Sequence, residues 1–193
     1  MRVGKCITTY TGIAFYPLDP RVQEVSTRDI AHALSLLCRA NGHYRHFYSV
    51  GQHSLNCAKE ARFRGYSERL QLACLLHDAS EAYISDITRP VKQELSQYLE
   101  MEQRLQQFIY TVYGLSDLTQ YECSLIKEID DDMLAYEMRL LLHSHEVCKG
   151  ELIGQHNFQF VMMKEVEDEF VRLVKELQNK LSLTSTMESL STP

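Results

Sequence analysis

Apolar residues along this chain recur at the spacing of helices. From Ser26 onwards they return every three or four positions, which places them on one face of an α-helix. The pattern predicts helices over residues 26–42, 49–65, 67–83, 97–113, 119–144 and 160–181, and a short helix near Thr88 and Pro90. No segment alternates between apolar and polar residues for long enough to predict a strand. We therefore expect an all-α fold, a single bundle of six or seven helices.

The two ends of the chain lack this periodicity. Residues 1–25 contain Gly12, Pro17 and Pro20 and predict an irregular N-terminal arm. Residues 182–193 are rich in Ser and Thr and predict a disordered tail. With no repeat and no internal linker between them, residues 26–181 are expected to form one domain.

Composition narrows the class of protein. The 193 residues are 45% hydrophobic and 24% charged, as in an ordinary globular domain. A net charge of -6 disfavours binding to a nucleic acid polymer. No apolar run approaches the roughly 18 residues of a membrane span, and we expect no signal peptide because the apolar stretch at the N-terminus is too short. The six cysteines form no C-x-x-C pair, so we expect reduced thiols and a cytoplasmic protein, in a bacterium or in the host of a phage.

Three polar residues stand in the apolar segment 67–83. In a continuous helix, His77 and Glu81 lie four residues apart and share one face. Asp78 is rotated by about 100° from His77 but lies three residues before Glu81. The three side chains can therefore border one cleft.

Two further polar residues occupy inward positions of other predicted helices. Asp130 falls inside the apolar stripe of 119–144, whereas Asp131 and Asp132 point away from the centre of that stripe. His53 shares the inward face of 49–65 with Cys57. Each residue alone has an ordinary explanation, such as a hydrogen-bonded core histidine or a carboxylate paired with arginine. Together, His53, His77, Asp78 and Asp130 predict a mixed nitrogen and oxygen site for a divalent metal, with Zn, Mn, Co or Mg as candidates.

A cluster of basic residues precedes His53. The segment from Arg39 to His46 includes Arg45 and two histidines, an unusual density of basic side chains for an acidic protein. A solvated loop is the ordinary explanation, because charged residues are mostly exposed. Its position beside the predicted metal site favours phosphate binding instead, to which Arg89 and Lys92 can contribute positive charge from the other side.

Three segments resemble a known family. YSVGQHSLNCA, LLHDASEAYISDITRPVK and IKEIDDDMLAYE are similar to the H…HD…D motifs of the HD-domain phosphohydrolases. The similarity is stronger to the small stand-alone deoxynucleotide hydrolases, which include bacterial 5'-deoxynucleotidases of the YfbR type and phage dATP hydrolases of the DatZ type. It covers roughly residues 12–140, and DIAHALSLLCRANGHYRHFYSVGQHS looks especially like the DatZ type.

The resemblance implies a role for each matching residue. The family's metal ligands match His53, His77, Asp78 and Asp130. Its catalytic carboxylates match Glu81 and Asp86, and its phosphate-binding residues match Arg39 and Lys92. Two positions depart from the family pattern. Ala40 stands where a bulky aromatic residue is common, and Ser85 replaces a glycine.

The implied activity is metal-dependent hydrolysis of a deoxynucleotide phosphoester. The leading substrate is a deoxynucleoside triphosphate, dATP by resemblance, with Glu81 handling the proton and Arg39 and Lys92 neutralising the phosphates. The alternatives are a 5'-deoxynucleotidase acting on dNMPs, a catalytically silent nucleotide-binding module, and a cyclic-nucleotide phosphodiesterase. The last usually needs more metal-binding histidines. We expect a small-molecule nucleotide as partner, no membrane, and a homo-oligomer.

Overall fold

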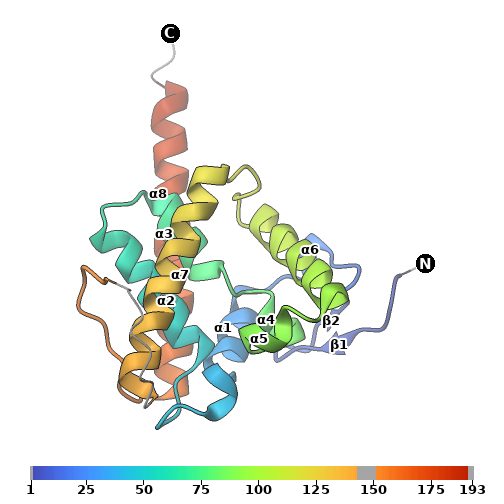
Figure 1. The fold of residues 1–193 in the computed structure, drawn as a ribbon. Helices are drawn as coiled ribbons and strands as arrows, with labels where there is room; N and C mark the ends of the chain where they lie inside the picture. Colours follow the sequence, from blue (N-terminus) through green and yellow to red (C-terminus); the bar gives the residue numbers. More distant parts are fainter. Residues whose placement is uncertain (1, 143–150, 191–193) are drawn as a thin grey trace.

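The computed structural model describes residues 2–142 and 151–190, with side chains up to residue 183, and it is mostly helical (Figure 1). This agrees with the expected all-α class. The α-helices are α1 (Thr27–Leu36), α2 (Val50–Phe63), α3 (Glu68–Leu76), α4 (Glu81–Ile84), α5 (Arg89–Lys92), α6 (Ser96–Val112), α7 (Gln120–Leu141) and α8 (Met163–Leu190). Two short 3-10 turns, η1 (Val22–Glu24) and η2 (Arg39–Gly42), flank α1.

The core forms where the long helices meet. α8 packs against α1, α2 and α3, while α7 packs against α2 and α3 on another side. Figure 1 shows α7 crossing in front of α2 and α3, with α4, α5, α6 and the small sheet to the right. The side chains buried between them are mostly aliphatic and include Ile30, Leu34, Val50, Leu72, Leu76, Ile129 and Phe170. The predicted metal ligands therefore come from elements that pack directly on one another.

Hydroxyl side chains start the helices close to where the sequence predicts. Ser49, Ser67 and Thr119 each accept a hydrogen bond from the backbone N–H three residues later. α1 is capped in the same way by Ser26. These caps are local interactions, which is why the sequence predicts them.

The N-terminal arm is more ordered than expected. Strands β1 (Ile7–Thr8) and β2 (Ala14–Phe15) pair antiparallel, so the expectation of no strand is wrong. Buried Asp29 on α1 holds the hairpin by accepting bonds from the Thr11 N–H and from the Thr9 hydroxyl. Strands of two residues are too short to show an alternating pattern.

The predicted helix over 67–83 is broken. α3 ends at Leu76, and α4 begins only at Glu81. The side-chain amide of Gln106 on α6 lies between the two, donating to Leu76 O at 2.7 Å and accepting from Ser80 N at 3.0 Å. This amide takes the place of the helical hydrogen bond between those two groups. His77 and Asp78 therefore lie in a turn, and the single-helix prediction is wrong.

Two helices also end away from their predicted positions. α1 ends at Leu36 rather than near Asn41–Gly42, because Val50 N donates to Leu37 O and Arg39 N donates to Tyr48 O, which turns the chain aside. The expected end near Ser144 lies outside the described residues. α8 begins at Met163 and continues to Leu190, so the predicted end at Leu181 is wrong, and 182–190 continue the helix. Residues 191–193 of the expected tail are outside the described residues.

No described helix combines the length and the hydrophobicity required to cross a membrane. Five cysteines in the described part of the chain carry free thiols, as expected, and Cys148 lies outside it.

Candidate metal centre

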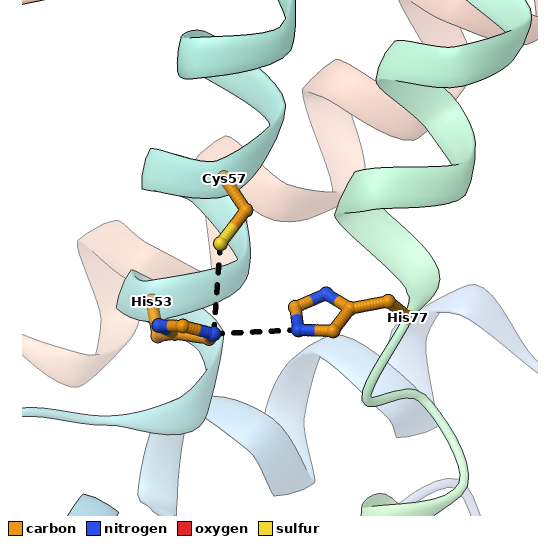
Figure 2. A group of neighbouring side chains, drawn as sticks. All are labelled: His53, Cys57 and His77. Carbon is orange, nitrogen blue, oxygen red and sulfur yellow. Dashed lines mark hydrogen bonds between the residues drawn. The ribbon is translucent and has the colours of Figure 1, made fainter. Parts of the chain in front are cut away.

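Two histidines face each other where α2 meets the turn after α3. The Nε2 atoms of His53 and His77 are 3.3 Å apart (Figure 2). His53 Nδ1 lies 2.6 Å from Glu137 Oε1, and His77 Nδ1 lies 2.8 Å from Cys74 O. Carbonyl and ionised carboxylate oxygens only accept hydrogen bonds, so both Nδ1 atoms carry the proton. Both Nε2 atoms are thus directed at one shared point.

Two carboxylates approach the same point. Asp130 Oδ1 lies 3.1 Å from His53 Nε2 and 3.7 Å from His77 Nε2. Asp78 Oδ2 lies 3.3 Å from His77 Nε2 and 3.8 Å from His53 Nε2. The structure therefore brings together all four side chains that the sequence proposes as ligands.

The electrostatics of this point favour positive charge. Burial and the nearby Arg39 disfavour protonation of His53, but the surrounding acidic groups outweigh them and raise its pKa well above the ordinary value. The pKa of His77 is also raised, because Asp78 and Asp130 offset the effect of burial. Burial alone would raise the pKa of Asp130, yet hydrogen bonds with the two histidines hold it well below the usual range. Such surroundings suit a bound cation.

A cysteine lies next to the histidine pair. Cys57 Sγ is 3.5 Å from His53 Nε2, and one ligand atom from each of His53, Cys57 and His77 lies within 4.8 Å of the others (Figure 2). This group is compatible with a divalent metal. Burial raises the pKa of the Cys57 thiol to about 11, so at neutral pH the thiol keeps its proton.

A pocket of about 250 Å³ opens beside these residues. Its polar wall contains four carboxylates and three cations, Asp78, Glu81, Asp86, Asp130, Arg39, Arg89 and Lys92. Its apolar wall consists mainly of Ala40, Ile87, Pro90, Leu134, Met138 and Leu142. A molecule with one anionic end and one apolar end would match both walls.

Glu81 lies in this pocket with an unusual environment. It is buried, and its Oε1 accepts a bond from Lys92 Nζ at 3.2 Å. Its Oε2 has no hydrogen-bond partner among the described residues. Burial and the neighbouring Asp78 and Asp86 raise the pKa of Glu81 well above its usual range. The pKa of Asp86 is raised as well, chiefly by burial. Burial therefore shifts both carboxyls towards their neutral form.

The predicted cations are differently placed. Arg39 is only 9% exposed, and its Nη1 lies 3.4 Å from Asp78 Oδ2. Lys92 Nζ bridges Glu81 and Glu102, the latter at 2.7 Å. Arg45 is exposed and is not part of the described pocket wall, and its N–H bonds to Leu141 O. Arg45, which the sequence proposes as a substrate-binding residue, therefore does not line this pocket.

Arg89, which is expected from the sequence to add positive charge together with Lys92, lines the pocket, and its Nη2 lies 3.3 Å from Asp130 Oδ2. Sequence reasoning missed two carboxylates of the site. Glu102 pairs with Lys92. Glu137 is fully buried against His53, and it lies seven residues after Asp130 on the same stripe of α7. That spacing was a signal in the sequence, since two helical turns bring a side chain back to nearly the same face.

No protein-family model matches the chain. It is 36% identical over 133 residues to the uncharacterized protein YfdR of Escherichia coli (strain K12), covering 69% of this chain and 70% of that protein. The chain belongs to the family of YfdR. It is also 38% identical over 104 residues to the uncharacterized protein RCAP_rcc00048 of Rhodobacter capsulatus, covering 51% of this chain and 53% of that protein. Neither relative's name states an activity, so any function must be argued from the site.

Proposed function

We propose that this protein is a metal-dependent phosphohydrolase of the HD-domain type that hydrolyses deoxynucleotide phosphoesters. One observation carries the proposal. Two histidines and two carboxylates converge on one point at the edge of a pocket that also holds Arg39, Lys92 and a buried Glu81. A metal-binding point beside cations and a proton-holding carboxyl is the combination that phosphoester hydrolysis needs.

The donor set fits a divalent metal held by His53, His77, Asp78 and Asp130. Both imidazoles present Nε2 to the shared point because Nδ1 is bonded to another acceptor, as is usual for metal-binding histidines. The ionised Asp130 is a better donor than the protonated thiol of Cys57, whose proton must be lost before the sulfur can bind a metal. Imidazole together with carboxylate suits Mn, Co or Zn. A divalent ion bound there supplies a Lewis acid that lowers the pKa of a water molecule.

The chain's own residues supply the remaining roles. Arg39 and Lys92 bind and orient the phosphate from two sides of the pocket. Glu81, whose pKa is raised, donates a proton to the departing oxygen, and Asp86 is the second group able to do so. The apolar wall that includes Leu134 and Met138 accommodates the nucleoside end.

The substrate assignment follows from the resemblance of the motifs. A deoxynucleoside triphosphate, dATP, is the leading substrate, and a dNMP is the alternative with the same motifs. Ala40, which lines the pocket, lacks the aromatic ring common at this position in the family. Cytoplasmic location and homo-oligomeric assembly stay predictions.

The test is a panel of dNTPs, dNMPs and NTPs incubated with Mn, Co, Mg or Zn in turn, with phosphate and nucleoside release measured. We expect metal-dependent release from deoxynucleotides and slower release from ribonucleotides. His77→Ala protein purified in the same way controls for contaminating phosphatases. Nucleotide binding without any release would support a silent binding module instead.

A further inference from the structure

Glu137 is a fully buried carboxylate on α7 that lies behind the four candidate ligands. Its Oε1 accepts the bond from His53 Nδ1 at 2.6 Å. Its Oε2 accepts bonds from Arg39 Nε at 3.3 Å and from the Tyr44 hydroxyl at 3.2 Å. Glu137 is not among the residues that line the pocket, so it acts only through its neighbours.

Placing a carboxylate in this position is costly unless its oxygens are fully bonded. Three hydrogen-bond donors meet the two Glu137 oxygens, which offsets the cost of burial. The three donors come from α2 and from the segment around η2, far away in the sequence. The arrangement therefore joins the candidate metal ligand and the candidate phosphate-binding residue through one side chain.

We infer that Glu137 is a positioning residue that holds His53 in its ligand tautomer and Arg39 in its anion-binding orientation. The inference rests on the proposed function, which supplies the metal and the phosphate. A carboxylate bonded to Nδ1 fixes the imidazole ring and makes Nε2 more basic. The same carboxylate, with Asp78 on the other side, holds the Arg39 guanidinium against the pocket.

The experiment compares zinc binding, followed by calorimetry with Zn²⁺ alone, in the unaltered protein and in Glu137→Gln. Glutamine keeps the length of the side chain but removes its charge. We expect zinc affinity to fall by about 10–100-fold, as is typical when the partner of a metal-binding histidine is lost. KM should rise as well, because Arg39 loses one of the two carboxylates that orient it.

Two matched variants test whether any buried glutamate has this effect. Glu60 is as buried as Glu137 and is bonded to His156 and Arg64, away from the pocket. Glu167 is a second buried glutamate, with its Oε2 2.9 Å from His32 Nδ1. Glu60→Gln and Glu167→Gln should bind zinc as tightly as the unaltered protein. Equal weakening in all three variants would overturn the inference, since general loss of buried charge would explain it.

The outcomes separate the two proposals. Zinc binding and hydrolysis in the unaltered protein, with unchanged zinc affinity in Glu137→Gln, would overturn only the positioning role. Absence of both zinc binding and hydrolysis in the unaltered protein would overturn both proposals.

Should circular dichroism show that Glu137→Gln does not fold, a measurement on the unaltered protein replaces it. A two-bond ¹H–¹⁵N correlation spectrum of the zinc-loaded protein, with ¹⁵N-labelled histidines, reports which imidazole nitrogen carries the proton. Zinc-bound His53 protonated at Nδ1 supports the inference. Zinc-bound His53 protonated at Nε2 would overturn it.

Discussion

Two buried glutamates in this protein are each bonded to one histidine and one arginine. Glu137 on α7 contacts His53 at 2.6 Å and Arg39 at 3.3 Å. Glu60 on α2 contacts His156 at 2.8 Å and Arg64 at 2.9 Å. Both glutamate side chains are 0% exposed, so neither can be distinguished by burial.

The two groups differ in what meets the second nitrogen of the histidine. His53 directs its Nε2 at His77 and Asp130, next to the pocket. The Nδ1 of His156 has no hydrogen-bond partner in the described chain, and its ring lies edge-on to Phe63 and Phe158.

The remaining bonds of Glu60 go to the backbone. It accepts the N–H groups of Ile153 at 2.9 Å and Gly154 at 3.0 Å, so it anchors the segment leading into α8. The same three residue types thus form a candidate reaction site in one place and a structural anchor in the other. Burial and charge pairing alone do not identify a functional site. What distinguishes the two groups is which other residues the histidine and the glutamate contact.

The largest expected effect separates the two histidines. His53→Ala should reduce hydrolysis to background and remove most bound zinc, because it deletes one of the two facing Nε2 atoms. His156→Ala should keep both properties and lower only the melting temperature. Hydrolysis rates, metal content and thermal melts of both purified variants make the comparison. Similar metal loss in the two would refute the distinction between site and anchor.

The second largest effect is expected at Glu81, the proposed proton donor of the hydrolysis. Glu81→Gln should lower kcat by about 10²–10⁴-fold, the usual contribution of general acid–base catalysis, with metal content unchanged. Glu102→Gln is the matched control, since Glu102 pairs with the same Lys92 and should cost far less. Loss of metal in Glu81→Gln would make Glu81 a ligand. Activity close to that of the unaltered protein would transfer the role to another group, with Asp86 the nearest candidate.

The structural role of Glu60 should be visible in how the stability of the protein depends on pH. Burial raises the pKa of Glu60, but bonds from Ile153, Arg64 and His156 outweigh burial and lower it from 4.5 to about 2. Because the pKa of Glu60 is lower in the folded protein than in the unfolded chain, the ionised carboxylate stabilises the fold at pH values above about 4.5. This contribution is lost as the pH falls from about 4.5 to about 2. The contribution at neutral pH is about 3 kcal/mol of unfolding free energy, at about 1.4 kcal/mol per pKa unit.

Urea unfolding of Glu60→Gln and of the unaltered protein between pH 7 and pH 2 measures this contribution. The difference between the two should be largest at neutral pH and should shrink in acid. A difference that stays constant over this range would contradict the role of the Glu60 charge.

The smallest effect is expected beside the site, at the neighbour of Asp130. Asp131 pairs with Arg89 and Lys127 on the surface, where such pairs contribute about 0–1 kcal/mol. Asp131→Ala should therefore keep most activity, whereas Asp130→Ala should abolish it. Asp132→Ala should also keep most activity, because Asp132 pairs with Arg64 of the anchor. Equal loss at 130 and 131 would show that the helical phase of α7 is misassigned.

Local features of the sequence determined much of this protein. The caps at Ser49 and Thr119 set where α2 and α7 begin, since a hydroxyl and the N–H it bonds are three residues apart. The period of the helix then directs His53 and Asp130 inwards. These statements need only neighbouring residues, so the pattern of the chain was sufficient to predict them.

Only the tertiary structure decided the features that depend on distant partners. Gln106 interrupts the helix before Glu81, although nothing near residue 77 signals a break. The sequence likewise does not show that Glu137 meets His53 while Glu60 meets His156, because each pair joins segments far apart in the chain. A hydrogen bond within a helix is set by the spacing of its residues, whereas a bond between helices depends on how the whole core packs.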